Sequence, residues 1–383
     1  MAVAGLWPGQ VVELAEHVPS VTCCVWRVVI GGRSCYAKYS YGASLVSVLA
    51  GTFGGWDEVR AAQQAYVAAP GSLLAREAAQ LELLSRLDGP QTPRLVGDRG
   101  GVLVTDAVPG MSLARLLQVE PWRTAELLGR TWAELRGLHR ADVADRLPAS
   151  LGLGERGILG TFTRRFRGAQ AKAYLDGLVL RGGDTGARSA RSTVPARRVV
   201  ARLRKLWLAH PLATDRPTVV YGDAKPEHVL FPDDAAGERP RLVDPALQLG
   251  PVTVDAAKLI SRTMLLLISS PPGSVNSVIL AAGLGEFLDQ LAASVREETG
   301  AAWWRELLLL WLTDTVNIAT TYLSAPAELD LPPQAAMVVS HARTVWALLD
   351  RLSAELDAGT DPHAVWRLGL ILAAQPVQPV VLP

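Results

Sequence analysis

The chain has 383 residues, of which 49% are hydrophobic, so it can bury a core in one large domain or two modest ones. Its 38 Lys and Arg and 37 Asp and Glu nearly cancel, and no aromatic interleaving or known motif indicates nucleic acid as a partner. No basic start is followed by an apolar run, and the longest apolar stretches are too short to cross a bilayer. We therefore expect a cytoplasmic protein without a membrane partner, whose three cysteines, Cys23, Cys24 and Cys35, stay reduced.

The first hundred residues predict a small β-rich unit. Residues 11–18, 23–30 and 35–39 have the composition of strands, and the Gly31-Gly32 pair predicts a turn between the second and third. Only four residues connect the first two strands, and none of them is glycine.

A helix with a carboxylate on its apolar face is predicted next. Residues 72–87 have helical periodicity, with an apolar stripe formed by Leu73, Leu74, Leu81 and Leu84. Glu77 falls in the middle of this stripe, where a carboxylate without a partner costs free energy. The preceding strand offers Lys38 as that partner, although a surface arginine could take the same place.

Residues 41–71 form an insertion between the Lys38 strand and the Glu77 helix. The insertion contains a glycine-rich GTFGGW stretch and then a helical pattern at residues 57–67. Two interpretations stay open: a packed helical insertion, or a lid or acceptor-docking element that joins two parts of a site.

Residues 102–106 predict a further strand, and Pro109-Gly110 behind it indicates a connection between two lobes. Most of the remaining chain is expected to be helical. The periodic segments are residues 112–118, 124–139, 256–269, 277–299, 302–323, 333–356 and 363–374. We interpret His139 as a helix-end residue rather than a catalyst, and we place Trp303, Trp304, Trp311 and Trp346 in the core, with an aromatic substrate wall as the alternative.

Positive charge is concentrated in residues 156–205. Thirteen Lys and Arg stand there against Asp176 and Asp184, a net charge of +11, whereas the rest of the chain carries −10. A surface of this sign attracts acidic ligands and repels polycations. The alternative is that these charges form a solvated helix face.

The most informative stretch is residues 219–258. An apolar run ends in a loop at Asp223, and two short strands, VLF and RLVD, pair across a polar turn and end at Asp244. Two carboxylates about twenty residues apart, each at a strand end, suit phosphoryl transfer. One would take a proton from a hydroxyl, and the other would hold magnesium on a nucleoside triphosphate. The alternative is a pair of hairpin-end carboxylates without chemistry.

The motifs VVYGDAKPEHVLF, RLVDPALQLG and DAAK resemble the catalytic core of the aminoglycoside-phosphotransferase branch of the protein-kinase-like superfamily. The resemblance extends from about residue 25 to residue 258. It implies an α+β, bilobal protein-kinase-like fold. The small β-rich N-lobe would be residues 1–106, with the insertion 41–71, and the large, mainly helical C-lobe would be residues 107–383.

The same resemblance assigns roles to individual residues and implies ATP and Mg²⁺ as cofactors. Asp223 would be the catalytic base, Asp244 a metal ligand, and Asp255 a brace of the catalytic loop. Lys38, set by Glu77, and Lys225 would contact phosphates. The remaining nucleotide contacts would come from Ser20 and Thr22, and from the backbone between Thr105 and Val108.

Two positions differ from the family pattern. Tyr221 stands where the family has a histidine, and His228 stands where it has a metal-binding asparagine. A neutral imidazole can bind a divalent ion, but magnesium prefers oxygen ligands, so a metal role for His228 stays open.

Three hypotheses remain for the acceptor. The Lys225-Pro226-Glu227 loop resembles that of Ser/Thr protein kinases, and residues 37–81 are similar to kinase subunits of split (class V type) lanthipeptide synthetases. Together with the basic segment, this favours a Ser or Thr of an acidic precursor peptide, whose phosphate a separate lyase protein would eliminate. The alternatives are a small-molecule antibiotic (aminoglycoside-type) kinase and a pseudokinase that binds partners without catalysis.

Overall fold

The computed structural model describes residues 6–20, 23–40, 54–168, 171, 174–175, 187–212, 217–232, 238–269, 274–295, 300–325 and 329–374. For residues 187–193 it describes the backbone alone. The predictions for Thr22 and for residues 41–53 of the insertion therefore lie outside the described residues.

The N-terminal part is built on an antiparallel sheet with the strand order β1-β2-β3-β5-β4. The strands are β1 (Val12–Val18), β2 (Cys23–Ile30), β3 (Arg33–Ser40), β4 (Leu95–Arg99) and β5 (Val102–Asp106). The predicted β2–β3 turn is present, and its residues Gly31 and Gly32 both have positive φ (55° and 82°), which suits a tight hairpin. Val28, Cys35 and Val104 are fully buried on one face of this sheet.

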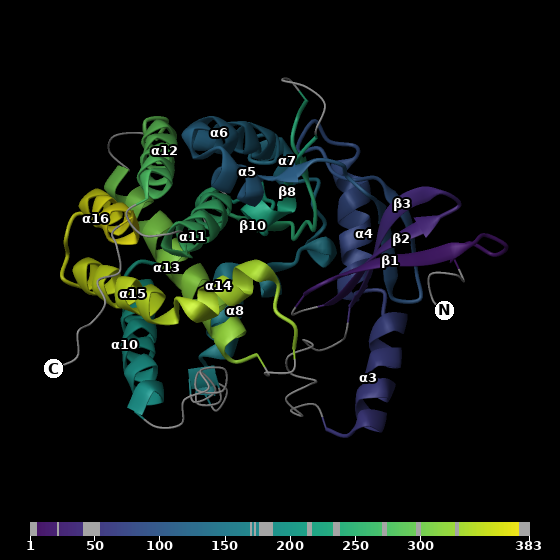
Figure 1. The fold of residues 1–383 in the computed structure, drawn as a ribbon, viewed down its shortest axis with the longest axis horizontal. Helices are drawn as coiled ribbons and strands as arrows, with labels where there is room; N and C mark the ends of the chain where they lie inside the picture. Colours follow the sequence, from purple (N-terminus) through teal and green to yellow (C-terminus); the bar gives the residue numbers. More distant parts are fainter. Residues whose placement is uncertain are drawn as a thin grey trace.

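Helix α4 (Leu73–Leu84) covers the other face and separates the sheet from the helical part of the molecule (Figure 1). Its Leu74 and Leu81 pack on Leu103 of β5, as the apolar stripe predicted. The second half of the insertion forms helix α3 (Trp56–Ala68), which extends away from the sheet edge. Gln63 of α3 donates hydrogen bonds to Tyr39 Oη (3.0 Å) and to the Ser40 carbonyl (2.9 Å), so α3 is tied to the Lys38 strand.

Helices dominate the chain after residue 112 (Figure 1). They are α5 (Leu113–Val119), α6 (Thr124–Leu135), α7 (Ala141–Ala144), α8 (Ile158–Arg165), α10 (Ala187–Ala209), α11 (Thr253–Ser269), α12 (Val275–Ala292), α13 (Gly300–Leu323), α14 (Pro333–Ser340), α15 (Ala342–Asp357) and α16 (Pro362–Ala374). Helix α13 is buried on nearly every face, because the other helices surround it. Trp304, Trp311 and Trp346 are buried in the core, which confirms the core interpretation for these three, and Trp303 is partly buried against the same core.

Three helix predictions need correction. Helix α12 ends at Ala292 rather than at residue 299. Helix α6 ends at Leu135 rather than at residue 139. The periodic segment 333–356 is two helices, because the chain breaks at His341. There the Met337 carbonyl accepts from the His341 backbone N–H (3.0 Å) and from Ser340 Oγ (2.8 Å). Polar side chains that bond to the backbone in this way compete with helix continuation, which periodicity alone does not reveal.

Two small sheets place the predicted catalytic residues. Strand β7 (Thr218–Val220) pairs with β10 (Gln248–Gly250), and β8 (Val229–Phe231) pairs with β6 (Met111–Ser112) and β9 (Arg241–Leu242). The predicted pairing of VLF with RLVD is therefore present. The predicted α+β bilobal, kinase-like fold is confirmed, although the boundary between the lobes after residue 106 stays a prediction. Among the described residues, no helix combines the length and apolarity needed to cross a membrane.

Candidate active site

The loop that carries Asp223 is held by a buried carboxylate from helix α11. Asp255 accepts hydrogen bonds from the backbone N–H groups of Tyr221 and Gly222, both at 2.8 Å, and also contacts His139 Nε2 at 3.0 Å. Gly222 has φ 77°, and a Cβ there would lie 2.2 Å from the Ala246 carbonyl oxygen, so only glycine fits. Asp255 thus braces the loop as predicted, and His139 is a further support of that brace.

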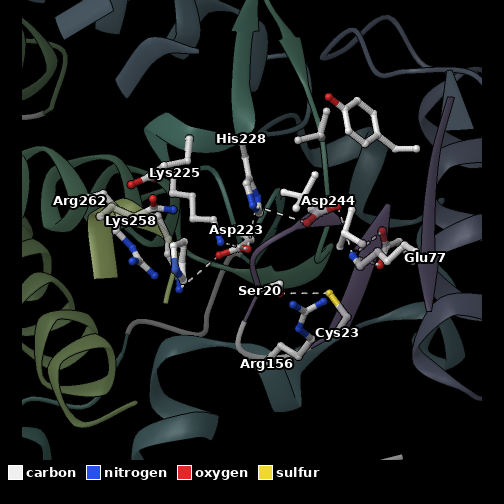
Figure 2. Close-up of a pocket in the computed structure, with 18 of the residues that line it drawn as sticks. Ser20, Cys23, Glu77, Arg156, Asp223, Lys225, His228, Asp244, Lys258 and Arg262 are labelled. Atoms are coloured by element: carbon white, nitrogen blue, oxygen red, sulfur yellow. Dashed lines mark hydrogen bonds and ion pairs between the residues drawn. The ribbon is translucent and has the colours of Figure 1, made fainter. Parts of the chain in front are cut away.

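Cations surround the Asp223 carboxylate (Figure 2). Lys225 Nζ lies 3.2 Å from Oδ2, and Lys258 Nζ lies 3.7 Å from Oδ1. Burial raises the pKa of Asp223, but Lys225, Lys258 and Arg156 outweigh it and hold that pKa well below its usual range. The carboxylate is therefore ionised at neutral pH, as a group that accepts a proton from a hydroxyl must be.

Asp244 projects into the same space from the loop after β9. It is the one described non-glycine residue with positive φ (57°), a conformation that costs free energy and is typical of functional loops. Its Oδ1 lies 3.2 Å from Lys38 Nζ. Burial raises the pKa of Asp244, but Lys38 and other cations lower it further, so this carboxylate is also ionised.

His228 lies between the two carboxylates (Figure 2). Its Nδ1 is 3.4 Å from Asp223 Oδ2, and its Nε2 is 3.5 Å from Asp244 Oδ2. Burial and the nearby Lys225 lower the pKa of His228 to about 3, so the ring is neutral. A neutral imidazole has one N–H for two carboxylates, and Nδ1 has no hydrogen-bond partner. One nitrogen lone pair therefore faces a carboxylate oxygen.

The predicted Lys38–Glu77 pair is present. Lys38 Nζ donates to both carboxylate oxygens of Glu77, at 2.9 and 2.8 Å, and both residues are buried. Burial lowers the pKa of Lys38, but Asp244 and Glu77 more than compensate, so its pKa lies above the usual value. Helix α4 thereby fixes a lysine on β3 in front of Asp244.

The predicted residues meet in one cavity of about 490 Å³ between the sheet and the helical part. Its lining includes Ser20, Lys38, Glu77, Thr105, Val108, Asp223, Lys225, His228 and Asp244. Thr22 lies outside the described residues. The structure thus brings together every other predicted site residue, while the assigned roles remain predictions.

Several charged residues of this cavity were not predicted as site residues, and Lys258 and Asp314 form a buried pair among them. Lys258 Nζ lies 2.8 Å from Asp314 Oδ1, and Ser261 Oγ donates to Asp314 Oδ2 at 2.6 Å. Both charges sit within apolar helices, α11 and α13. The signal that identified Glu77, a charge inside an apolar helical pattern, would have identified them as well.

The basic segment 156–205 divides between the cavity and the surface. Arg156 and Arg165 line the cavity, whereas Arg164 and Arg167 are exposed. Arg198, Arg202 and Lys205 on α10 form ion pairs with Asp350 and Asp357 of α15. The segment is therefore only in part a free positive surface.

Residues 65–265, more than half of the chain, match the phosphotransferase enzyme family. The chain belongs to this family. The predictions of a kinase or phosphotransferase and of this family are thereby confirmed, and the lanthipeptide resemblance stays a prediction. The matched range includes helix α4 and the catalytic loop of the phosphotransferase, but not the strand that carries Lys38.

Solved structures with similar folds include several phosphotransferases. An aminoglycoside-3'-phosphotransferase of type VIII has 21% identity, with 80% of this chain and 96% of that chain covered and a TM-score of 0.42. An ethanolamine kinase from Plasmodium vivax has 10% identity, with 88% of this chain and 84% of that chain covered and a TM-score of 0.47. The aminoglycoside phosphotransferase APH(3'')-Id from Streptomyces rimosus has 18% identity, with 81% of this chain and 95% of that chain covered and a TM-score of 0.41. No curated protein matches the sequence at a significant level.

Proposed function

We propose that this phosphotransferase transfers the γ-phosphate of ATP to a Ser or Thr hydroxyl of an acidic precursor peptide. The peptide would belong to a lanthipeptide-like biosynthesis, in which a separate lyase protein eliminates the phosphate. The observation that carries the proposal is the ionised Asp223 between two halves of one cavity. Lys38, Glu77 and Asp244 lie on one side of it, and Lys258 and Asp314 lie on the other.

The transfer is a single displacement. Asp223 orients the acceptor hydroxyl and takes its proton, while the acceptor oxygen forms a bond to the γ-phosphorus. The bond from that phosphorus to the β,γ-bridging oxygen breaks, and its electron pair leaves with ADP. In this scheme Lys38 and Lys225 balance the phosphate charge, and Ser20, Thr105 and Val108 line the nucleotide half of the cavity.

The chemistry around Asp244 fits one divalent cation. Magnesium is commonly held by one or two carboxylates, with phosphates and water completing its shell. Accordingly, no group of three or more His, Cys, Asp or Glu among the described residues is arranged to hold a metal without such help. Asp244 offers a carboxylate, and His228 Nε2 lies 3.5 Å from its Oδ2, so a ring that carries its proton on Nδ1 would present a lone pair beside that carboxylate. An ion held there would neutralise charge on the transferred phosphate.

The charges of the acceptor half favour an acidic ligand over a polycation. Asp314 is engaged by Lys258 and Ser261, and Asp223 is flanked by Lys225. An aminoglycoside-type acceptor would need unengaged carboxylates, because its ammonium groups must be balanced when they lose water. Glu227, whose Oε2 has no hydrogen-bond partner among the described residues, offers one, but the cations of this half outnumber it. Arg165 and Arg262 add positive charge to this half of the cavity.

Mass spectrometry can test the acceptor directly. The purified protein would be incubated with ATP, Mg²⁺ and synthetic Ser/Thr peptides, each made with acidic and with neutral flanking residues. We expect a mass gain of about 80 Da on the acidic peptides and none with Asp223→Asn. Phosphorylation of an aminoglycoside instead would establish the small-molecule kinase. ATP binding without turnover on either acceptor would establish the pseudokinase.

A further inference from the structure

Arg156 is a half-buried cation of the cavity whose guanidinium makes no hydrogen bond or ion pair within the described part of the chain. Its Nη1 atom is fully buried without a partner. A buried guanidinium N–H without an acceptor costs free energy, and arginine cannot escape that cost by losing its proton. A cation kept in this state indicates that its partner is a ligand.

The positive charge and the unused N–H donor of Arg156 select an anionic ligand, and its surroundings place that ligand beside the Asp223 loop. Arg156 lies near Ser20 and Cys23, below Asp223 (Figure 2). Burial lowers the pKa of Arg156, but Asp223, Glu77 and Asp244 together raise it, so all three carboxylates lie within electrostatic reach. The guanidinium therefore faces the space between the residue that would orient the acceptor and the residues that would hold the nucleotide.

The loop that carries Arg156 is held in place from three directions. Arg76 of helix α4 donates to the Gly152 carbonyl (2.9 Å) and pairs with Glu155. Gln80, one turn further along α4, donates to the Leu151 carbonyl (2.6 Å). The Leu153 N–H donates to the Leu247 carbonyl (2.8 Å), three residues beyond Asp244.

Arg156 itself is positioned by the start of helix α8. A Cβ on Gly157 would lie 2.5 Å from Gln248 Oε1, and one on Gly160 would lie 2.6 Å from the Gly154 carbonyl. The backbone around Arg156 is therefore closely packed and pre-organised. Pre-organised charges stabilise a transition state most, because they need no rearrangement when the reaction occurs.

We infer that Arg156 is a catalytic residue that contacts the γ-phosphate of ATP during its transfer to the acceptor. The inference rests on the proposed use of ATP. The planar guanidinium would donate two hydrogen bonds to phosphate oxygens opposite Lys38. It would stabilise the charge on these oxygens as the bond to the acceptor oxygen forms and the bond to ADP breaks. Asp223 would hold the proton released by the acceptor.

Nucleotide affinity distinguishes a contact with the γ-phosphate from a general effect of Arg156 on nucleotide binding. Dissociation constants for ATP and ADP would be measured by calorimetry, with Mg²⁺ and without acceptor, for the wild type, Arg156→Gln, Arg156→Lys and Arg343→Gln. Arg343 is an exposed arginine at the start of α15 and provides a matched change of charge. We expect Arg156→Gln to weaken ATP binding about tenfold or more and ADP binding much less, because ADP lacks the γ-phosphate. Arg156→Lys should recover part of the loss.

Turnover and ligand-free stability complete the test. Arg156→Gln should lower kcat by about 10²–10³-fold, the effect of removing one transition-state donor. Its melting temperature without ligand should fall, because Asp223, Glu77 and Asp244 favour the Arg156 charge in the folded protein, whereas the losses of ATP affinity and kcat should persist at temperatures where the variant is fully folded. Equal losses for ATP and ADP, or unchanged ATP affinity and kcat, would overturn the role of Arg156 alone. A wild type that binds neither nucleotide would overturn the proposed function with it.

Discussion

At the scale of single residues, the site depends on carboxylates that stay ionised at neutral pH. Asp223 and Asp244 are both ionised because cations surround them, and His228 stays neutral between them because it is buried. A neutral ring leaves a lone pair free for a ligand, whereas a protonated ring would repel a metal ion. These charge states suit the proposed roles of Asp223 as proton acceptor and Asp244 as cation ligand.

The first prediction concerns Asp223. Asp223→Asn removes the proton acceptor but keeps the shape of the side chain and its contacts with the loop. We expect kcat to fall about 10²–10⁴-fold. The fold and the affinity for ATP should stay close to those of the wild type, as measured by circular dichroism and calorimetry. Turnover near the wild-type level would show that Asp223 is not the base.

The second prediction concerns the Lys38–Glu77 pair. Lys38→Met and Glu77→Gln should each impair catalysis, because each breaks the same buried contact. The double variant should lose less than the sum of the two activation free-energy losses, with a coupling of about 1–3 kcal/mol. Steady-state kinetics on all four proteins measures it. Lys205→Met, which removes a lysine paired with Asp357 on the surface, is the control and should leave kcat unchanged. Strict additivity would mean that Lys38 and Glu77 act separately.

At the scale of elements, helix α4 connects the parts of the site. Its Glu77 holds Lys38, its Arg76 and Gln80 hold the loop of Arg156, and Gln80 Oε1 accepts from the Leu247 N–H (2.9 Å). One helix thus sets the lysine, the arginine and the segment after Asp244. Any displacement of α4 would disturb all three, so its position decides whether the site is assembled.

A second pair of elements is joined by charge. Arg198 and Arg202 of α10 both pair with Asp350 of α15, which is 23% exposed. Burial raises the pKa of Asp350, but the two arginines lower it below the ordinary value of 3.8. A lowered carboxyl pKa contributes stability above the unfolded-state pKa, and this contribution is lost as the pH falls through the folded-state value.

The third prediction follows from that sign. Asp350→Asn should lower the free energy of unfolding by about 1 kcal/mol at pH 7, as expected for a partly exposed ion pair. The difference from the wild type should stay constant down to about pH 4.5 and shrink only below 3.8, where the unfolded chain binds a proton. Urea denaturation across this pH range measures it. A difference that grew on acidification would contradict the assignment.

At the scale of the whole molecule, charge is distributed unevenly. Residues 156–205 carry +11 and the remainder −10, although the chain is nearly neutral. Part of this excess on α10 is paired with a carboxylate of α15, and Arg156 and Arg165 line the cavity. Arg164 and Arg167, near the N-terminal end of this segment, remain exposed. They are the charges that an acidic peptide would meet first.

The fourth prediction uses these exposed charges. If an acidic peptide docks there, its affinity should fall steeply with salt, because exposed charges are screened beyond about 8 Å at physiological ionic strength. The double variant Arg164→Gln, Arg167→Gln should weaken peptide binding, mainly through the association rate, and leave ATP affinity unchanged. Stopped-flow fluorescence at two salt concentrations measures it, with Arg343→Gln as the control. Peptide affinity indifferent to both salt and the substitutions would favour a small-molecule acceptor.

The sequence by itself determined the parts of the site that depend on local pattern. Asp223 and Asp244 were predicted because each ends a short apolar strand, and Glu77 because a carboxylate interrupts an apolar stripe. The Lys38–Glu77 contact followed from the cost of burying that carboxylate alone. Helix ends were less predictable, since the break at His341 arises from side-chain bonds to one carbonyl.

Only the tertiary structure decided which distant charges join Asp223, Asp244 and Glu77 in the site. Lys258 and Asp314 are 56 residues apart and meet because α11 packs on α13. Arg156 belongs to a loop without any periodic pattern. Its place in the cavity depends on Arg76, 80 residues earlier in the chain, which donates a hydrogen bond to that loop. Periodicity reports which face of one element is buried. The meeting of two elements depends on packing between surfaces that no single segment encodes.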